Sequence, residues 1–98
     1  MQSKNKKINL MTNLRILDAS LDSGIDDNSL IGLNLIKLDA CYNEKIKKIN
    51  HMTNLRVLNA EGDCGIDDNS LVGLNLIKLN AYGNKKIISK IDSKNKKN

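Results

Sequence analysis

The sequence predicts an α/β fold in which four similar repeats stack and share one parallel β-sheet. Residues 7–46 match residues 48–87 at 29 of 40 positions when the chain is shifted by 41, so the chain is a tandem duplication. Each copy contains two shorter blocks of the pattern Leu-x-x-Leu-x-Ala, which begin at Leu14, Leu35, Leu55 and Leu76. A block of about 20 residues cannot bury an apolar face by itself and does so by stacking on its neighbours.

Each block predicts a short β-strand, because a Leu is followed two residues later by an Ala and alternate residues of a strand share a face. The inward pairs are Leu17 and Ala19, Leu38 and Ala40, Leu58 and Ala60, and Leu79 and Ala81. Parallel strands need a return crossover, so the segments between the blocks must carry the chain back along the opposite side of the core.

The heptapeptide Gly-Ile-Asp-Asp-Asn-Ser-Leu occurs at 24–30 and again at 65–71. Its carboxylates suggest either a metal or catalytic cluster or the N-cap of a short helical turn. We favour the cap, because adjacent carboxylates do not reproduce the alternate-residue ligands of a calcium loop, whereas Asp and Asn are preferred before the first helical residues. Short helical or 3-10 turns are expected there, with positive φ at Gly24 and Gly65. No metal and no cofactor is expected.

A carboxylate or carboxamide lies three residues past each Ala, which completes the pattern L-x-x-L-x-A-x-x-(N/D). With this pattern the chain resembles the leucine-rich repeat family, in particular its short-repeat, internalin-like class. The resemblance implies a right-handed β-α solenoid of four coils, with the sheet on a concave face and helical turns on a convex face. It also implies a structural ladder that hydrogen-bonds buried backbone groups, formed by Asp22, Asn43, Asp63 and Asn84. The chain departs from the family in using Ala for the second Leu and Asp at two ladder positions.

The expected organisation is one domain at 7–91, made of two 41-residue units, with basic tails at 1–6 and 92–98. The net charge of +5 comes from these ends, because residues 8–86 carry nine basic and ten acidic side chains. Lysine tails support nonspecific contact with nucleic acid, but no basic groove or aromatic platform accompanies them, so nucleic acid is disfavoured as a partner. No apolar run approaches the ~20 residues of a membrane span. A cytoplasmic location is expected.

The resemblance implies that a protein or peptide partner binds the concave face, through the side chains that alternate with the buried Leu and Ala. The expected partner-binding residues are Asp18, Lys37, Asp39, Tyr42, Asn59, Lys78, Asn80 and Tyr82. They include both aromatic residues of the chain, and Tyr is a common interface anchor. The alternative, that these are solvated strand positions without a partner, stays open.

Catalysis is not expected, because no nucleophile, base and orienting group can be assembled from this sequence. His51 is the only histidine, and its counterpart in the first copy is Leu10. The two cysteines, Cys41 and Cys64, are expected to be free thiols, since their places in neighbouring repeats would strain a disulfide.

The ends of the stack suggest a second function. Residues 1–7 offer almost no apolar cover, and the C-terminal end offers only Ile87, Ile88 and Ile91 as a partial cap. Uncapped ends would expose apolar surface and a strand edge. The alternative prediction is therefore a structural unit that self-associates through its ends.

Overall fold

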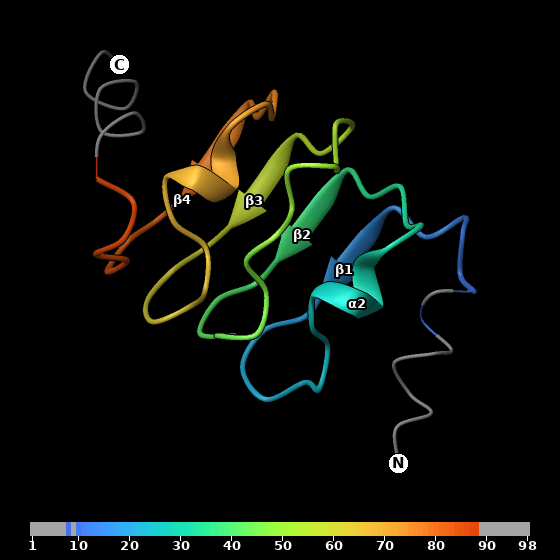
Figure 1. Cartoon of the computed structure of the whole chain (residues 1–98), viewed down its shortest axis with the longest axis horizontal. Helices are drawn as coiled ribbons and strands as arrows, with labels where there is room; N and C mark the ends of the chain where they lie inside the picture. Colours follow the sequence, from blue (N-terminus) through green and yellow to red (C-terminus); the bar gives the residue numbers. More distant parts are fainter. Residues whose placement is uncertain (1–7, 9, 89–98) are drawn as a thin grey trace.

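The four strands within the described part of the chain form one parallel sheet in the order β1-β2-β3-β4 (Figure 1). The computed structural model describes residues 8 and 10–88. Its strands are β1 (Ile16–Asp18), β2 (Lys37–Asp39), β3 (Val57–Asn59) and β4 (Lys78–Asn80). The register places Leu17 beside Leu38, Leu38 beside Leu58 and Leu58 beside Leu79. The prediction of a parallel sheet with one strand from each repeat is confirmed.

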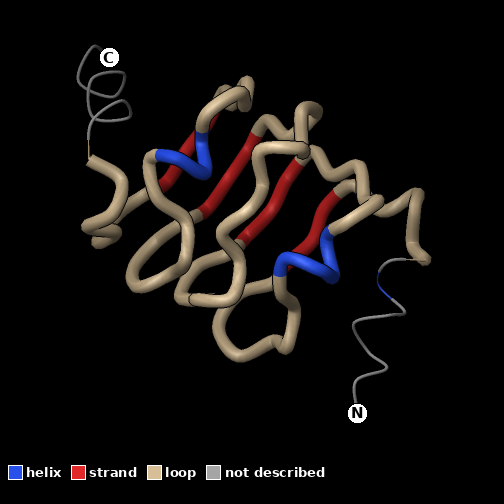
Figure 2. Tube along the Cα trace, in the orientation of Figure 1, coloured by secondary structure: helices blue, strands red, loops and turns tan. Residues whose placement is uncertain are grey.

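The two copies of the heptapeptide form the helical segments α2 (Asp27–Leu30) and η1, a 3-10 turn at Asn69–Leu71. Loops and turns make up most of the rest of the described residues (Figure 2). The helical segments come from the crossovers between β1 and β2 and between β3 and β4, whereas the crossover between β2 and β3 contains only turns. The prediction of short helical turns at both heptapeptides agrees with these elements.

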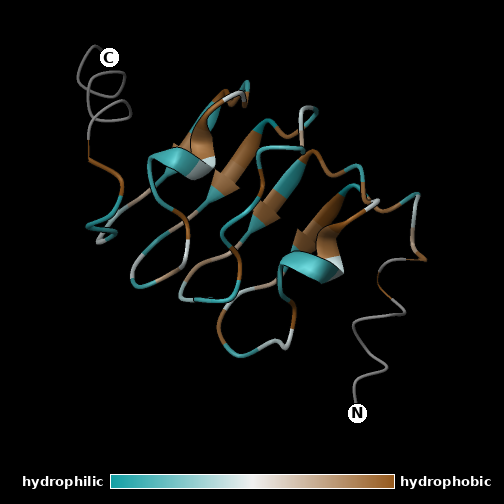
Figure 3. Ribbon diagram, viewed as in Figure 1, coloured by the Kyte–Doolittle hydropathy of each residue, from teal (hydrophilic) through white to brown (hydrophobic). Residues whose placement is uncertain are grey.

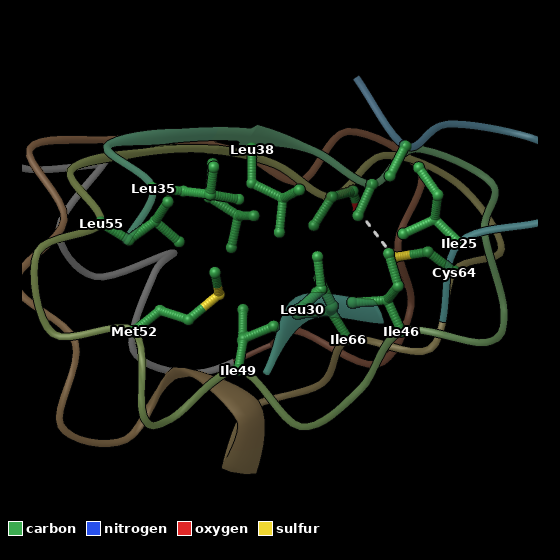
Figure 4. Close-up of a cluster of buried hydrophobic side chains, with 14 of the residues drawn as sticks. Ile25, Leu30, Leu35, Leu38, Ile46, Ile49, Met52, Leu55, Cys64 and Ile66 are labelled. Atoms are coloured by element: carbon green, nitrogen blue, oxygen red, sulfur yellow. Dashed lines mark hydrogen bonds between the residues drawn. The ribbon is translucent and has the colours of Figure 1, made fainter. Parts of the chain in front are cut away.

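The core lies between the sheet and the returning segments. Leu35 and Leu38 point into it from the sheet side, and Leu30 and Ile49 point into it from the opposite side (Figure 4). Aliphatic side chains from all four repeats fill this space. Figure 3 shows hydrophobic residues in all four strands, with hydrophilic residues beside them. Close packing of small aliphatic groups therefore replaces the aromatic anchors that the sequence lacks.

The first Asp of each heptapeptide caps its own turn. Asp26 accepts a hydrogen bond at Oδ1 from Ser29 N (3.0 Å), while Asp26 N donates to Ser29 Oγ (3.0 Å), which is a capping box. Asp67 and Ser70 make the same reciprocal bonds, at 3.0 and 3.1 Å. The N–H of the first Asp is thus satisfied at each turn, and the Ser N–H, which also donates to the Asp carbonyl (3.0 and 3.1 Å), gains a second acceptor.

The second Asp of each heptapeptide holds the next repeat. Asp27 Oδ1 accepts from Lys47 N (2.8 Å) and Lys48 N (2.9 Å), and Asp68 Oδ1 accepts from Ile88 N (3.2 Å). These bonds join residues about one repeat apart, so the paired aspartates connect successive repeats through backbone N–H groups.

The expectation of positive φ at both heptapeptide glycines is wrong for Gly65. Gly24 has φ +87°, but Gly65 lies outside the left-handed region. Gly65 is required for a different reason, because a Cβ there would lie 2.6 Å from Ile46 O and 2.8 Å from Glu44 O. In the second copy the glycine permits a close approach to the preceding repeat.

Asn43 makes the contacts expected of a ladder residue. It is 2% exposed, and its Nδ2 donates to Ala19 O (2.6 Å) and Ile25 O (3.0 Å) of the preceding repeat. Its Oδ1 accepts from Lys45 N at 2.9 Å. The equivalent bonds of Asn84 reach Ala60 O (2.8 Å), Ile66 O (3.1 Å) and Lys86 N (2.8 Å). One carboxamide in each copy therefore satisfies three backbone groups.

The ladder expectation for Asp22 and Asp63 has to be corrected, because both side chains are exposed. In each case the side chain of the following residue points toward the core instead. Ser23 Oγ donates to Ala19 O (3.2 Å), and Cys64 Sγ donates to Ala60 O (3.4 Å). This inward position faces backbone carbonyl oxygens, which need a hydrogen-bond donor. An ionised carboxylate has no donor, so Asp22 and Asp63 do not occupy the position.

The predicted tails, at 1–6 and 92–98, and Ile91 of the predicted partial cap lie outside the described residues. Ile88 is exposed and is tied to the preceding repeat through its backbone N–H. Among the described residues, none of the helical segments has the length and apolar character needed to cross a bilayer.

Candidate functional site

The sheet face that points away from the core carries two columns of side chains in register. The first contains Ile16, Lys37, Val57 and Lys78, and the second contains Asp18, Asp39, Asn59 and Asn80. The leucines between them, such as Leu38 and Leu58, are fully buried on the opposite face. We call this surface, with the residues that flank each strand, the outer face. It holds six of the predicted partner-binding residues within the strands.

The second column also shapes the chain beyond each strand. Asp18 Oδ1 accepts from Ser20 N (3.1 Å) and Ser20 Oγ (2.6 Å), and the hydroxyl bond, followed by the backbone bond, lowers the pKa of Asp18 below its usual value. Asp39 Oδ1 accepts from Cys41 N (3.1 Å), and Asn80 Oδ1 accepts from Tyr82 N (3.2 Å). One oxygen of each of these side chains therefore stabilises a local turn.

Glu61 belongs to the outer face, although it was not among the predicted binding residues. Its Oε2 accepts from Asn80 Nδ2 (2.6 Å), and its Oε1 lies 3.9 Å from Cys41 Sγ. The carboxylate therefore connects side chains from three successive repeats. Its position two residues after β3, in the same column as Cys41, was the available sequence signal.

The two tyrosines lie beyond the ends of the strands, in different settings. Tyr42 has φ +57° and is 53% exposed, and its ring covers Gly62, where a Cβ would collide with it. Tyr82 is 83% exposed, and its carbonyl accepts from Gly62 N. The third repeat separates them along the sheet, so they do not form one aromatic cluster.

The predicted binding residues do not include a pair of arginines at the start of the strands. Arg15 and Arg56 line a pocket of about 250 Å³ with Asn34, Ile36 and Asn54. Arg15 Nη1 donates to Thr12 O, Leu14 O and Asn34 O (3.1–3.4 Å), and Arg56 Nη1 donates to Thr53 O and Leu55 O (3.0–3.1 Å). The available signal was the alternation of Leu-Arg with Leu-Ile along the four blocks.

The arginine pocket has oxyanion-binding groups on two sides of an apolar residue. In each guanidinium, Nη1 is held by backbone carbonyls, while the Nε–H and Nη2–H edge makes no hydrogen bond within the described part of the chain. That edge is the one that binds carboxylate or phosphate in a bidentate manner. Since one strand separates β1 from β3, the two arginines start about 10 Å apart.

A second pocket, of about 360 Å³, lies at the opposite margin of the outer face. Leu21, Asp22, Tyr42 and Glu44 contribute to its walls. Side chains of both charges and Tyr42 therefore line the margin where the strands end, because Lys45 accompanies Asp22 and Glu44 there, whereas arginines line the margin where the strands begin.

The remaining candidate groups, the histidine and the two cysteines, lie in separate settings. His51 is exposed on a turn. Among residues 8 and 10–88, no three His, Cys, Asp or Glu side chains are grouped so as to hold a metal ion. Cys41 and Cys64 are free, and Cys64 Sγ also accepts from Asn84 Nδ2 at 3.3 Å.

We expect the Cys41 thiol to react slowly. Burial, followed by the hydrogen bond to Asp39, raises the pKa of Cys41 from 9.0 to about 12. At pH 8 a smaller fraction of Cys41 is therefore present as thiolate, while each thiolate is more nucleophilic because it is more basic. The first effect is larger, so alkylation of Cys41 by iodoacetamide should be about 50-fold slower than that of free cysteine. Between pH 9 and 12 the Cys41 thiol is still protonated in the folded state but ionised in the unfolded chain. The free energy of unfolding should therefore fall as pH rises from about 9 toward 12. A Cys41→Ser variant should lose this modification, and native labelling at the rate of free cysteine would refute the expectation.

Comparisons with protein-family models, curated proteins and solved structures find no match for this chain.

Proposed function

We propose that the chain is a leucine-rich-repeat solenoid of four coils, with the outer face as its concave side. One strand per repeat, parallel pairing in register and inward Asn43 and Asn84 support this proposal. The capped turns α2 and η1 would lie on the convex side. A reducing, intracellular compartment belongs to the same proposal, supported by two thiols whose sulfur atoms contact different neighbours.

We further propose that the protein is a non-catalytic module that binds a protein or peptide through the outer face. Exposed large apolar side chains carry this proposal. Six of the eleven among the described residues lie in the strands or within three residues of them, and they are Ile16, Leu21, Ile36, Tyr42, Ile77 and Tyr82. Exposed large apolar side chains among charged and amide groups are typical of a binding surface.

The charges of the outer face indicate the kind of partner. Two guanidinium edges at one margin have no carboxylate partner within the described residues, and Lys37 and Lys78 are exposed beside them. A segment carrying carboxylates would pair with this margin, and apolar groups of the same segment would cover Ile36. The best fit is therefore an acidic peptide segment with apolar residues.

Selection from a displayed library of random peptides tests this function. Selected peptides should be rich in Asp, Glu and apolar residues, and their binding should weaken about tenfold in Tyr82→Ala, the loss of a moderate hot spot. Arg56→Lys should weaken binding too, because Lys keeps the charge but loses the bidentate edge. Binding is measured by calorimetry.

Val72→Ala is the matched control, because Val72 is an exposed apolar residue next to η1, outside the outer face. It should bind the selected peptides like the wild type. Equal loss in Val72→Ala and Tyr82→Ala, or no loss in either outer-face variant, would overturn the proposal.

Self-association is the second candidate function, favoured by a difference between the duplicated units. The leucines of the first unit are almost fully buried, at Leu30, Leu33, Leu35 and Leu38. Their counterparts, 41 residues later, are only partly buried, at Leu71, Leu74, Leu76 and Leu79. The fourth repeat thus leaves apolar surface uncovered by the described residues, which favours burial against another chain.

A further inference from the structure

We propose that copies of this protein associate head to tail, with β4 of one copy pairing in parallel with β1 of the next. The pairs would be Lys78 with Ile16, Leu79 with Leu17, and Asn80 with Asp18. The proposal rests on the second candidate function and names the two surfaces that meet. Its template is the junction between β2 and β3 within one chain, because the duplication makes β4 the counterpart of β2 and β1 the counterpart of β3.

The backbone groups needed for this pairing are present on both edges. At the internal junction, Ala40 N donates to Asn59 O (2.8 Å), Tyr42 N donates to Glu61 O (3.1 Å), and Val57 N donates to Ile36 O (3.1 Å). The corresponding groups are Ala81 N with Asp18 O, Gly83 N with Ser20 O, and Ile16 N with Ile77 O. They point to the free edges of the sheet, because β1 pairs only with β2 and β4 pairs only with β3 in the described residues. Unpaired strand edges are templates for another chain.

The apolar residues at the two edges also correspond. Leu38 packs beside Leu58 and Leu35 beside Leu55 at the internal junction, where all four are fully buried. At the proposed junction the same residue types meet, with Leu79 beside Leu17 and Leu76 beside Leu14. These four are only partly buried in one chain. Pairing would bury them as their counterparts are buried.

At the margin where the strands end, each junction brings one large residue against one glycine. The partner that supplies the glycine differs between the two junctions. Internally, the large Tyr42 ring lies on Gly62, which has no side chain. At the proposed junction, Gly83 would lie beside Leu21, so the residue without a side chain comes from the other partner. All four of these positions have φ between +57° and +76°, and the backbone therefore has the same course at each. One large residue and one glycine meet in both cases, which avoids a steric clash.

This contact joins two different surfaces of the molecule, so it does not close on itself in a dimer. A head-to-tail contact of this kind allows further copies to add at each end. The sheet and its outer face would then continue from copy to copy, with Asn80 beside Asp18 as Asp39 lies beside Asn59 within the chain.

Light scattering on the full chain, across a hundredfold range of concentration, tests the proposal. The wild-type mass should rise above 10.9 kDa with concentration. Ile16→Pro removes the β1 donor on an exposed edge, where Pro is tolerated, and should hold the mass at one chain. Gly83→Tyr should do the same by placing a ring against Leu21 of the next copy. The protein should accommodate this ring, because a Cβ at Gly83 has no heavy atom closer than 3.8 Å and Tyr42 has a similar φ.

Two further samples identify the surfaces. A mixture of Ile16→Pro with Gly83→Tyr retains one free β4 and one free β1, so its mass should rise to two chains and stop. The double variant Gly83→Tyr with Leu21→Gly exchanges the volumes as Tyr42 and Gly62 do, and should recover the wild-type rise in mass. Circular dichroism checks that each variant is folded.

Two outcomes would overturn the inference, and they are distinguishable. A wild-type mass that rises while the folded variants rise equally would place self-association on another surface, leaving the second candidate function intact. A constant wild-type mass would exclude both. If slow hydrogen exchange at Ala81 N–H accompanies the constant mass, then a segment of the chain itself occupies the β4 edge.

Discussion

Replacing Asn43 by alanine should lower the free energy of unfolding by about 3 kcal/mol, because the buried Ala19 and Ile25 carbonyls lose their donor and Lys45 N loses its acceptor. Ala19 O retains a bond from Ser23 Oγ, but Ile25 O has no other bond of this kind from a side chain in the described region. Urea unfolding followed by circular dichroism measures the change. An unchanged slope of free energy against urea concentration would attribute it to the native state.

Asp22→Ala is the matched control for Asn43→Ala. Both residues lie three positions past the strand Ala, in adjacent repeats, but Asp22 is exposed. Its replacement should change stability by about 0.5 kcal/mol or less. If Asp22→Ala costs as much as Asn43→Ala, then the ladder includes the aspartates and the hydrogen bonds of Asn43 do not explain the stability.

Replacing Gly65 by alanine should cost about 3 kcal/mol, at the upper end of the range for overpacking. The new Cβ would lie 2.6 Å from Ile46 O and 2.8 Å from Glu44 O, and neither backbone atom can rotate away as a flexible side chain can. Relief would require the second and third repeats to separate. Thermal unfolding should show a lower transition temperature.

Gly24→Ala is its control, in an identical heptapeptide. Gly24 has φ +87°, and a Cβ there would have no heavy atom within 4 Å, so the replacement meets backbone strain alone and should cost about 1 kcal/mol. A cost at Gly24 equal to that at Gly65 would show that local conformation, rather than the contact between repeats, makes the glycine necessary.

The sheet could be predicted because its signal is local and repeated four times. Leu and Ala at alternate positions specify which side of each strand is buried, and aligning the repeated Leu-x-x-Leu-x-Ala blocks specifies the register. The two columns of the outer face follow from the same alternation. Their hydrogen bonds to the turns could not be predicted, because they depend on how the chain bends after each strand.

The arginine pair and the contacts of Glu61 could not be predicted for a related reason. Taken singly in the sequence, each of these arginines and Glu61 is a charged residue next to a strand, and such residues are usually exposed to solvent. Arg15 and Arg56 become a candidate site only when the sheet brings them to the same pocket, and Glu61 becomes a connection only when Asn80 and Cys41 lie beside it.

The sequence by itself determined the duplication, the four parallel strands, the division between buried leucines and the outer face, and the capped turn in each heptapeptide. These features depend on residue spacing and on contacts within a few residues. Only the tertiary structure decided that Ser23 and Cys64 take the inward position beside Asp22 and Asp63, and that identical glycines at 24 and 65 have different conformations. The physical reason is that both outcomes depend on the course of the backbone after each strand. That course directs the donors of Ser23 and Cys64 toward Ala19 O and Ala60 O, and it brings Ile46 O and Glu44 O of the preceding repeat against Gly65.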